Sequence, residues 1–519
     1  MNTETILLIN PPVVRPCEAP AGIARLLGVL QGHGVRCRVL DANLEGLMHL
    51  LDHPAEPEDT WSKRAVRNRS SNLSALRNKD LYRGRDRYRR VVGEINRVLD
   101  GAARSQAVQI SLANYQDPSR SPLRSSDLIE AAERPEKNPF YPYFMERLEG
   151  LFDDEEPSLV GISLNYLSQS LPAFSLIGLA RKLCPKARYV LGGGLVTSWL
   201  SNPEWTNPFC GLVDDMIAGP GECPLLEMAG ITTPVSHAAP EYAPFRGLPY
   251  LSPGRVLPYS TSNGCWWGRC TFCPEKAEGN AYAPLPADTI LSEIDHLVVN
   301  ESPSLIHFLD NAMSPALLAA IADHPRGIPW YGFARITRHL TDPSFCNELK
   351  RSGCVMLKIG LESGDQGVLE ALDKGIDLVE ASSALKTLKE AGIGTYVYLL
   401  FGTPAETERE AKRTLDYVIR HHRYIDYMNL AIFNMPAYGP DAAGLDTQEF
   451  YDGDLTLYRQ FRHPGGWNRG KVRRFLEGEF RKNPVVREII LRDPPVFTSN
   501  HAPFFVMADR GETGMERKS

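Results

Sequence analysis

The sequence predicts an α/β protein made of a doubly wound parallel sheet, a partial (β/α)6 barrel and a mixed C-terminal region. Strand and helix patterns alternate over residues 1–50 and again over 159–218. A stretch rich in Pro and Ala then interrupts the chain at 232–258, and a second alternating series follows it. These observations predict a first domain at 1–235 with an insertion at about 52–150, a linker at 236–255, a barrel domain at 256–450 and a C-terminal region at 451–519.

The first domain begins with a β-α-β pattern. Residues 6–9 form a short apolar run that suits a buried parallel strand. Apolar residues at 23, 26, 27 and 30 share one face of the helix that follows, Gly32 and Gly34 end this helix, and a second strand covers 37–40. Further strands are predicted at 159–164, 189–191 and 216–218, with a helix near 170–183. Sheets of this kind bind ligands beyond the carboxyl ends of their strands.

The second series predicts six strands with room for a helix after each. The strands lie near 256–261, 305–309, 329–333, 355–361, 395–401 and 427–433, and one of the helices covers 376–391. Six β-α units indicate a partial barrel that is smaller than the full eight-fold form.

The composition is that of an ordinary globular protein, with 43% hydrophobic and 23% charged residues. The net charge of −6 argues against nucleic acid as a partner. No apolar run reaches the roughly 18 residues of a membrane span, and the N-terminus lacks the features of a secretory signal. We therefore expect a cytoplasmic protein without a membrane partner, whose ten cysteines are thiols or metal ligands rather than disulfides.

One segment departs from the acidic balance. Residues 61–100 carry 12 Lys and Arg against 4 Asp and Glu, with Tyr82 and Tyr88 between them. Such a segment could contact RNA phosphates or an acidic peptide. A solvated, partly helical insertion explains the same composition, because the counter-charges elsewhere leave the chain acidic. Residues 113–122 are expected to form a structured loop over the sheet.

The stretch GCWWGRCTFCPE, residues 264–275, holds Cys265, Cys270 and Cys273. A structural zinc site would need a fourth ligand, but no Cys or His follows until His296. A plant-type [2Fe–2S] centre fits the C-x4-C-x2-C spacing, but the next cysteine, Cys346, lies far along the chain. A third interpretation is a [4Fe–4S] cluster on three cysteines, which leaves one iron open to a substrate or cofactor.

The residues that follow this motif resemble a known family. Phe272 precedes the last cysteine, and further matches follow in order at 307–311, 330–335, 359–364, 374–375 and 402–407, the last with the pattern G-x-P-x-E-T. Residues 256–440 are thus similar to a radical S-adenosylmethionine (SAM) domain. The commonest spacing in that family is C-x3-C-x2-C, so the additional residue is interpreted as a loop insertion that Gly268 can accommodate.

The resemblance implies that the open iron binds the amino and carboxylate groups of SAM. An external one-electron donor of the ferredoxin or flavodoxin type would then drive cleavage of SAM to methionine and a 5′-deoxyadenosyl radical. The resemblance assigns five positions to SAM binding: Phe272, which would lie against the adenine, and Asp310, Arg335, Glu362 and Ser363. For Glu362 and Arg335, the alternative role is a structural ion pair at the end of a strand.

A flavodoxin-like sheet before such a barrel resembles the cobalamin-binding radical SAM enzymes. The implied cobalamin-binding residues all end predicted strands, although any of the glycines could equally be a turn residue. They are Asn10, Pro11, Pro12, Ser163, Gly192, Gly193, Gly194, Gly221 and Glu222.

The segment DANLEG at 41–46 looks like the cobalamin motif D-x-H-x-x-G with Asn in place of His. It follows the second predicted strand, whereas that motif follows the first. We therefore interpret it as a loop and expect no histidine ligand to cobalt. His33 and His49 are expected to be surface residues.

The function implied by the resemblance is that of a cobalamin-dependent radical SAM methyltransferase. One SAM would methylate cob(I)alamin, and a second would give the radical that abstracts hydrogen from an unactivated carbon, which then takes the methyl group. A cobalamin radical SAM enzyme that catalyses a rearrangement or cyclisation is the alternative among enzymes. An RNA- or peptide-binding protein with a structural cluster is the alternative of another class. The substrate is expected to be a small molecule, a peptide or a protein.

Overall fold

The computed structural model describes residues 5–232, 237–439, 444–494 and 501–506. The chain divides into two compact units, which we call the N-terminal unit and the barrel unit. The N-terminal unit contains Met1–Pro253 and Tyr451–Leu457, and the barrel unit contains Gly254–Phe450 and Tyr458–Ser519. The change of unit after Pro253 thus falls within the predicted linker. Most of the predicted C-terminal region belongs to the barrel unit.

The N-terminal unit is built on a five-stranded parallel sheet with the order β2-β1-β5-β6-β7. This order confirms the predicted flavodoxin-like, doubly wound fold. The direction of winding reverses between β1 and β5, and the edge beyond the carboxyl ends of these strands is the expected ligand side. The strands are β1 (Thr5–Ile9), β2 (Arg36–Leu40), β5 (Leu159–Ser163), β6 (Arg188–Gly192) and β7 (Asp215–Met216).

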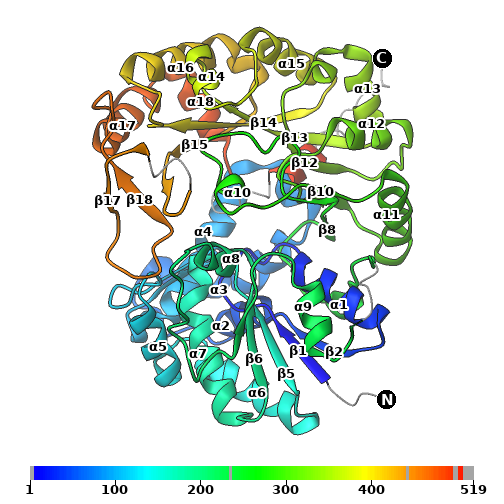
Figure 1. Ribbon diagram of the computed structural model, residues 1–519, viewed down its shortest axis with the longest axis vertical. Helices are drawn as coiled ribbons and strands as arrows, with labels where there is room; N and C mark the ends of the chain where they lie inside the picture. The colour runs from blue at the N-terminus through cyan, green and yellow to red at the C-terminus, as the bar shows by residue number, and fades with distance from the viewer. Residues whose placement is uncertain (1–4, 233–236, 440–443, 495–500, 507–519) are drawn as a thin grey trace. The chain divides into compact units, whose positions relative to one another are not determined.

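Four helices connect and cover this sheet (Figure 1). They are α1 (Ala21–Gly32), α7 (Leu167–Leu183), α8 (Gly194–Leu200) and α9 (Glu222–Met228). Right-handed crossovers place α1 on one face and the helices of the opposite winding direction on the other. Helix α9 follows the last strand and packs against α1.

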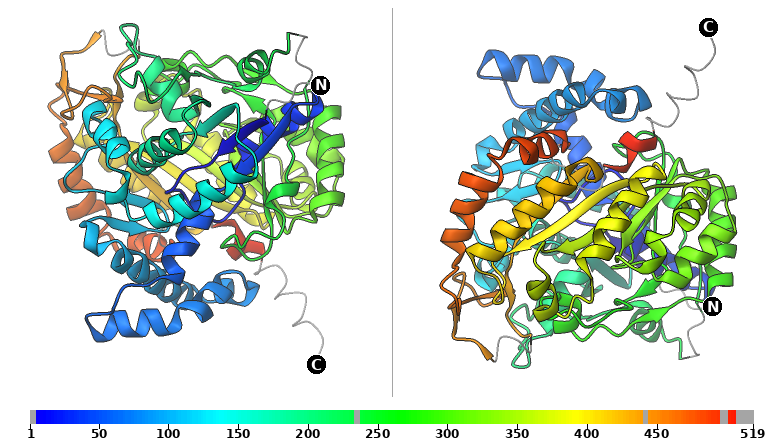
Figure 2. Two further views of the ribbon diagram at one scale, coloured as in Figure 1. Left: turned by 90° about the horizontal axis from the view of Figure 1, so that it is seen from below. Right: turned by 90° about the horizontal axis from the view of Figure 1, so that it is seen from above.

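The insertion between β2 and β5 is folded and mostly helical. A partly helical insertion was the predicted alternative to an RNA- or peptide-binding segment. Helices α3 and α4 pack against each other and are the two long blue helices of Figure 2. Residues 113–122 were expected to be a loop. They contain one strand of a short antiparallel hairpin, in which Tyr115 lies opposite Ile110 of the other strand. The insertion and its flank comprise α2 (Ala42–Asp52), α3 (Thr60–Leu76), α4 (Arg85–Ala102), β3 (Gln109–Ser111), β4 (Asn114–Gln116), α5 (Ser125–Glu133) and α6 (Tyr141–Asp154).

The two tyrosines of the basic segment belong to the core of this insertion, whereas Trp61 of the same segment is 65% exposed. Tyr82 and Tyr88 are 2% and 0% exposed, and their ring centroids lie 5.3 Å apart. Bases of single-stranded RNA stack on exposed aromatic rings, so these two tyrosines do not provide that kind of surface. Tyr82 and Tyr88 thus give the RNA-binding interpretation no support.

The barrel unit contains a six-stranded parallel sheet in which the strands follow one another in chain order. This confirms the predicted partial (β/α)6 barrel. The strands are β8 (Val256–Tyr259), β11 (Leu305–Phe308), β12 (Trp330–Ala334), β13 (Cys354–Glu362), β14 (Gly394–Phe401) and β15 (Tyr427–Ile432). The helices between them lie on the outer side of the sheet (Figure 1) and are α11 (Ala287–Glu301), α12 (Pro315–Asp323), α13 (Pro343–Arg351), α14 (Gln366–Ala371), α15 (Leu378–Glu390) and α16 (Glu408–His421).

A hydrophobic cluster fills the amino end of the barrel. It brings together the first residues of several strands, and Ala502 and Phe505 from the C-terminal part of the chain pack against them. Because this end is filled, the chemistry of the unit belongs at the carboxyl ends of the strands. The other short elements of the unit are β9 (Ser262–Asn263), α10 (Pro274–Ala277), β10 (Ala283–Pro284), β16 (Met435–Pro436), β17 (Thr447–Glu449), β18 (Tyr458–Phe461), α17 (Arg469–Phe475) and α18 (Pro484–Arg492).

None of the helices in the described ranges combines the length and the apolar character that crossing a lipid bilayer requires.

Candidate cluster and cofactor sites

The three cysteines lie in the loop that follows the first barrel strand, at the carboxyl end of β8. The base of this loop is held by Asp310, which is 2% exposed. The hydroxyls of Thr261 and Ser262 each donate to Asp310 Oδ1 at 2.6 Å, and the Thr261 N–H donates to Oδ2 at 3.2 Å. Asp310, predicted to contact SAM, therefore anchors the cysteine loop.

The three cysteine side chains differ in their exposure. Cys270 is buried, Cys265 and Cys273 are half-buried, and all three are free thiols. Burial raises the pKa of Cys273 above that of an ordinary thiol. In the part of the chain that the structure describes, no three His, Cys, Asp or Glu side chains converge on a single-ion site. Cysteines that each bind a different iron of one cluster need not converge on one point.

The lengthened part of the cysteine loop rests on the turn at residues 372–375. Gly268 has a φ of +60°, the left-handed conformation that the loop insertion was predicted to need. The indole of Trp267 lies so close to Gly375 that a Cβ there would come within 2.2 Å of it. Trp267 Nε1 also donates to the Asp373 carbonyl at 2.8 Å. The additional residue thus belongs to a docked, well-packed loop.

A buried ion pair stands beside this loop. Glu362 ends β13 with a φ of +66°, and its Oε1 lies 2.8 Å from Lys374 Nζ. The two side chains are only 12% and 7% exposed. Lys374 Nζ also lies 5.4 Å from the ring centroid of Phe272. Glu362 and Phe272, both assigned to SAM by the resemblance, therefore come together around a lysine to which the sequence assigned no role.

Arg335 directly follows β12 and reaches the cysteine loop. Its Nη1 donates to Cys270 Sγ at 3.7 Å, and its Nη2 donates to the Lys374 carbonyl. Its guanidinium lies 4.3 Å from the ring centroid of Trp267. Burial lowers the pKa of Arg335, whereas the charge of Cys270 raises it. The side chain is thus a buried cation next to a predicted cluster ligand.

Ser363 is buried against α16, and its contact with SAM stays a prediction. It is 0% exposed, and its Oγ is 3.2 Å from Thr414 Oγ1 on α16. The same Oγ accepts the Asp365 N–H at 3.1 Å. Its hydroxyl is engaged in holding the turn after β13 against α16.

In the N-terminal unit, the turn after β1 is held by a buried polar network. Asn10 Nδ2 donates to Asp41 Oδ1 at 2.9 Å, and Tyr250 Oη donates to Asp41 Oδ2 at 2.7 Å. Gln169 Nε2 donates to the Pro11 carbonyl at 2.8 Å. Burial raises the pKa of Asp41, although the hydrogen bonds from Tyr250 and Asn10 lower it. Asn10, Pro11 and Pro12 are buried, so they support the turn after β1 from within the unit.

The segment at 41–46 is the first turn of a helix, not the predicted loop. Asp41 is the N-cap of α2, and its side chain accepts the Leu44 N–H at 3.2 Å. Asn43 is 2% exposed and its Oδ1 accepts the Val14 N–H at 2.8 Å. A Cβ at Gly46 would meet the ring of Phe140 at 3.0 Å. Helix packing thus explains the residues of this segment.

The glycines after β6 leave an open backbone edge. Gly193 has a φ of +110°, and a Cβ there would come within 2.5 Å of the Leu164 carbonyl oxygen. The side chain of Asn165 links this turn to the end of β5. Its Oδ1 accepts the Gly194 N–H at 2.9 Å, and its Nδ2 donates to Ser163 Oγ at 3.0 Å. Asn165 was not among the predicted residues, although its position two residues after β5 was a usable signal.

The turn after β7 also lies at this edge. Gly221 is the N-cap of α9 and is half-buried. Glu222 pairs with Arg25 of α1, and its role at cobalamin stays a prediction. Gly192, Gly193 and Gly221 are half-buried and Gly194 is exposed, so these glycines lie at least partly at the surface of the edge.

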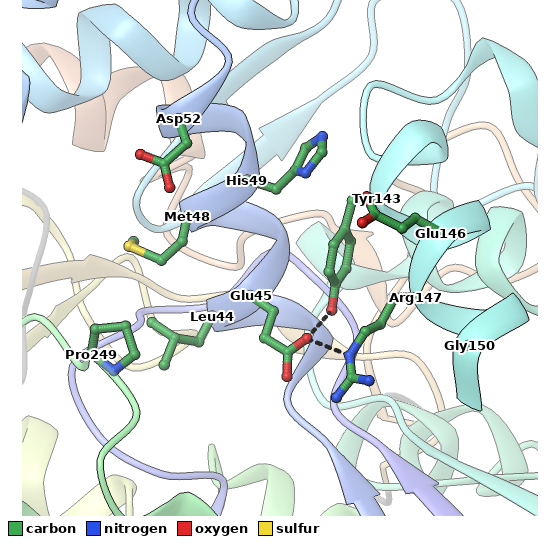
Figure 3. A pocket seen from close by; sticks show the side chains of 10 residues that line it. All are labelled: Leu44, Glu45, Met48, His49, Asp52, Tyr143, Glu146, Arg147, Gly150 and Pro249. Carbon is green, nitrogen blue, oxygen red and sulfur yellow. Dashed lines mark hydrogen bonds and ion pairs between the residues drawn. The ribbon is translucent and has the colours of Figure 1, made fainter. Parts of the chain in front are cut away.

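A cavity of about 500 Å³ lies beside α2 and α6 (Figure 3). Glu45 Oε2 accepts from Tyr143 Oη at 3.0 Å and from Arg147 Nε at 2.8 Å inside it. His49 also lines this cavity and, like His33, is half-buried rather than fully at the surface. None of the predicted cobalamin-binding residues lines it.

One part of the barrel unit matches a protein-family model. Residues 259–418 match the model of the Radical SAM superfamily. The barrel unit contains a radical SAM domain. An uncharacterized methyltransferase of Pyrococcus horikoshii is 23% identical to the chain over 319 residues, which cover 53% of the chain and 67% of that relative. The bacteriochlorophyllide d C-12(1)-methyltransferase of Chlorobaculum tepidum is 24% identical over 178 residues, or 32% of the chain and 38% of that relative.

Solved radical SAM structures share the fold over both units. The radical SAM methyltransferase TsrM of Kitasatospora setae, solved with cobalamin and a [4Fe–4S] cluster, has a TM-score of 0.53 and 18% identity, covering 88% of the chain and 82% of TsrM. The cobalamin-dependent enzyme OxsB, solved with aquacobalamin and SAM, has a TM-score of 0.50 and 14% identity, covering 99% of the chain and 62% of OxsB. The chain has the fold of the cobalamin-dependent radical SAM enzymes.

Proposed function

We propose that the protein is a cobalamin-dependent radical SAM enzyme that methylates an unactivated carbon. The observation that carries this proposal is the presence, in one chain, of a three-cysteine loop at the mouth of a (β/α)6 barrel and a flavodoxin-like sheet with an open glycine edge. TsrM combines the same two parts and was solved with both cofactors. The two curated relatives named above are both methyltransferases, which favours methyl transfer over rearrangement or cyclisation.

The residues present suit these cofactors. Cys265, Cys270 and Cys273 would hold the cluster, and Phe272 and Glu362 would bind and orient SAM. When bound, the cluster supplies the electron that cleaves SAM, and cobalamin carries the methyl group.

The glycine edge after β6 and β7 would admit the cobalamin tail, since it presents backbone without side chains. Asn43 stands where the related motif has histidine, and its amide oxygen is already committed to Val14. We therefore propose that cobalamin binds without a histidine ligand from this segment. An external one-electron donor of the ferredoxin or flavodoxin type and a small-molecule or peptide substrate complete the system.

The test is anaerobic reconstitution of the full chain, followed by assay for 5′-deoxyadenosine and for bound-cobalamin absorbance. We expect wild type to show both, and a triple Cys→Ala variant at 265, 270 and 273 to bind cobalamin but to form no 5′-deoxyadenosine. Equal amounts of product from the two proteins would refute the proposal. With substrate in hand, a product heavier by about one CH2 separates methylation from rearrangement.

Gly193→Ala is expected to reduce bound cobalamin by at least about tenfold, while SAM cleavage by the barrel unit persists. The new Cβ would occupy a backbone conformation with φ of +110° and overlap the Leu164 carbonyl oxygen, so the turn must move. Cobalamin absorbance and 5′-deoxyadenosine are measured on the same preparation. Gly22→Ala is the control, because a Cβ there meets nothing within 4 Å and cobalamin binding should be unchanged. Full cobalamin occupancy in Gly193→Ala would show that this edge is not the binding site.

A further inference from the structure

We propose that Arg335 raises the reduction potential of the cluster through its contact with Cys270. This inference rests on the proposed function, because it requires that the three cysteines hold a cluster. The contact is a charged N–H donor, Arg335 Nη1, at 3.7 Å from Cys270 Sγ. Arginine makes strong, charge-assisted hydrogen bonds to anionic acceptors, and a cluster thiolate is such an acceptor.

The guanidinium is held in place on three sides. Its Nη2 donates to the Lys374 carbonyl, and its Cζ lies 4.3 Å and 5.6 Å from the ring centroids of Trp267 and Trp266. Arg335 is only 7% exposed, so water screens its charge poorly. The positive charge of Arg335 is therefore held in a fixed position and would stabilise negative charge on the neighbouring Cys270 sulfur.

The direction of the effect follows from the charge change. Reduction adds one electron from the external donor to the cluster and makes or breaks no bond to Arg335. The reduced cluster is one unit more negative than the oxidised cluster, so the nearby cation and its N–H group stabilise the reduced form more. Removing the cation should therefore make the cluster harder to reduce.

The chain offers a matched control in Arg269. Its guanidinium also lies over Trp267, at 5.0 Å from the ring centroid. It pairs instead with Asp373 at 3.1 Å, and its side chain is 63% exposed. Arg269 thus shares the tryptophan and the charge of Arg335 but is screened by water and by a carboxylate.

The experiment is a redox titration, followed by electron paramagnetic resonance, of the anaerobically reconstituted full chain without SAM. Arg335→Met is expected to lower the ratio of reduced to oxidised cluster at the wild-type midpoint by about tenfold, which corresponds to a midpoint about 59 mV more negative. Arg335→Lys, which keeps the charge but not the forked donor, should fall between wild type and Arg335→Met. Arg269→Met should titrate like wild type. Iron content is measured for every protein.

Three results would overturn this inference. If Arg335→Met titrates like wild type but SAM no longer perturbs its spectrum, Arg335 is the SAM contact that the sequence predicted. If both Arg335 variants lack iron while Arg269→Met is loaded, Arg335 builds the loop and does not tune the cluster. If Arg269→Met shifts as far as Arg335→Met, the effect is not specific to Cys270. A wild-type chain that assembles no cluster would instead refute the proposed function.

Discussion

Lys374→Met is expected to destabilise the barrel unit by about 3–5 kcal/mol and to abolish SAM cleavage. The substitution leaves the Glu362 carboxylate in a site where its side chain is 12% exposed and its partner, at 2.8 Å, is gone. A buried charge without a partner carries the full cost of its lost hydration, which is the reason for so large an effect. The free energy of unfolding from urea titration and the yield of 5′-deoxyadenosine measure the two consequences.

Two further variants show whether burial of the pair is the cause. Adding Glu362→Gln to Lys374→Met removes the stranded charge and should restore most of the lost stability without restoring SAM cleavage. Lys412 and Glu408 form an ion pair of the same length, 2.8 Å, but are 47% and 56% exposed. Lys412→Met should therefore have little effect on stability. Similar losses in Lys374→Met and Lys412→Met would disprove the argument.

The strands of both sheets could be predicted from the sequence because buried parallel strands are short, almost continuous apolar runs. The run at 6–9 became β1, and the run at 395–401 became β14, each within a residue. The loop predicted at 41–46 was wrong because the prediction overlooked a local helix signal. An aspartate before a stretch of helix formers is an N-cap pattern, and Asp41 has that role.

The hairpin β3–β4 shows a second limit. Each of its strands has only three residues, which is too short for an alternating pattern to be recognised. The hairpin packs against α4, and a contact between distant parts of the chain cannot be predicted from the residues of the hairpin alone.

The cysteines and Glu362 could be proposed as site residues because their spacing and neighbours form recognisable motifs. Trp267 and Asp373 could not be linked in the same way, since their hydrogen bond joins residues 106 positions apart. Asp310 and Ser363 were correctly placed at strand ends, but their side chains turn to the cysteine loop and to α16. A motif gives the position of a residue, whereas the direction of its side chain depends on what the fold packs around it.

Glu406→Gln is expected to remove a loss of stability that the barrel unit suffers as the pH rises from about 4.5 to about 7. Burial raises the pKa of Glu406 from 4.5 to about 7, despite hydrogen bonds from the Gly402 N–H and Trp467 Nε1. Glu406 is 1% exposed, and no donor among the described residues reaches its Oε1. Such a site favours the protonated carboxyl.

The sign of the effect follows from the two pKa values. Below pH 4.5 Glu406 is protonated in the folded and the unfolded chain, so the site costs nothing. Between pH 4.5 and 7 only the unfolded chain releases the proton, and stability falls by up to about 3 kcal/mol. Above pH 7 the cost is constant. Gln does not titrate and still accepts the Gly402 and Trp467 bonds, so the stability of Glu406→Gln relative to wild type should rise across this window and then level off.

Glu410 on α16 supplies the opposite case. Burial alone would raise its pKa, but hydrogen bonds from Thr407 and Arg409 hold it at about 2. Its contribution is present above pH 4.5 and is lost only as the pH falls towards 2. Urea titrations at pH 5, 6, 7 and 8 should therefore give a difference between Glu410→Gln and wild type that does not change with pH. If the difference for Glu406→Gln is equally flat, Glu406 is ionised in the folded protein throughout this range, and the carboxyl at the carboxyl end of β14 has a partner that favours its charge.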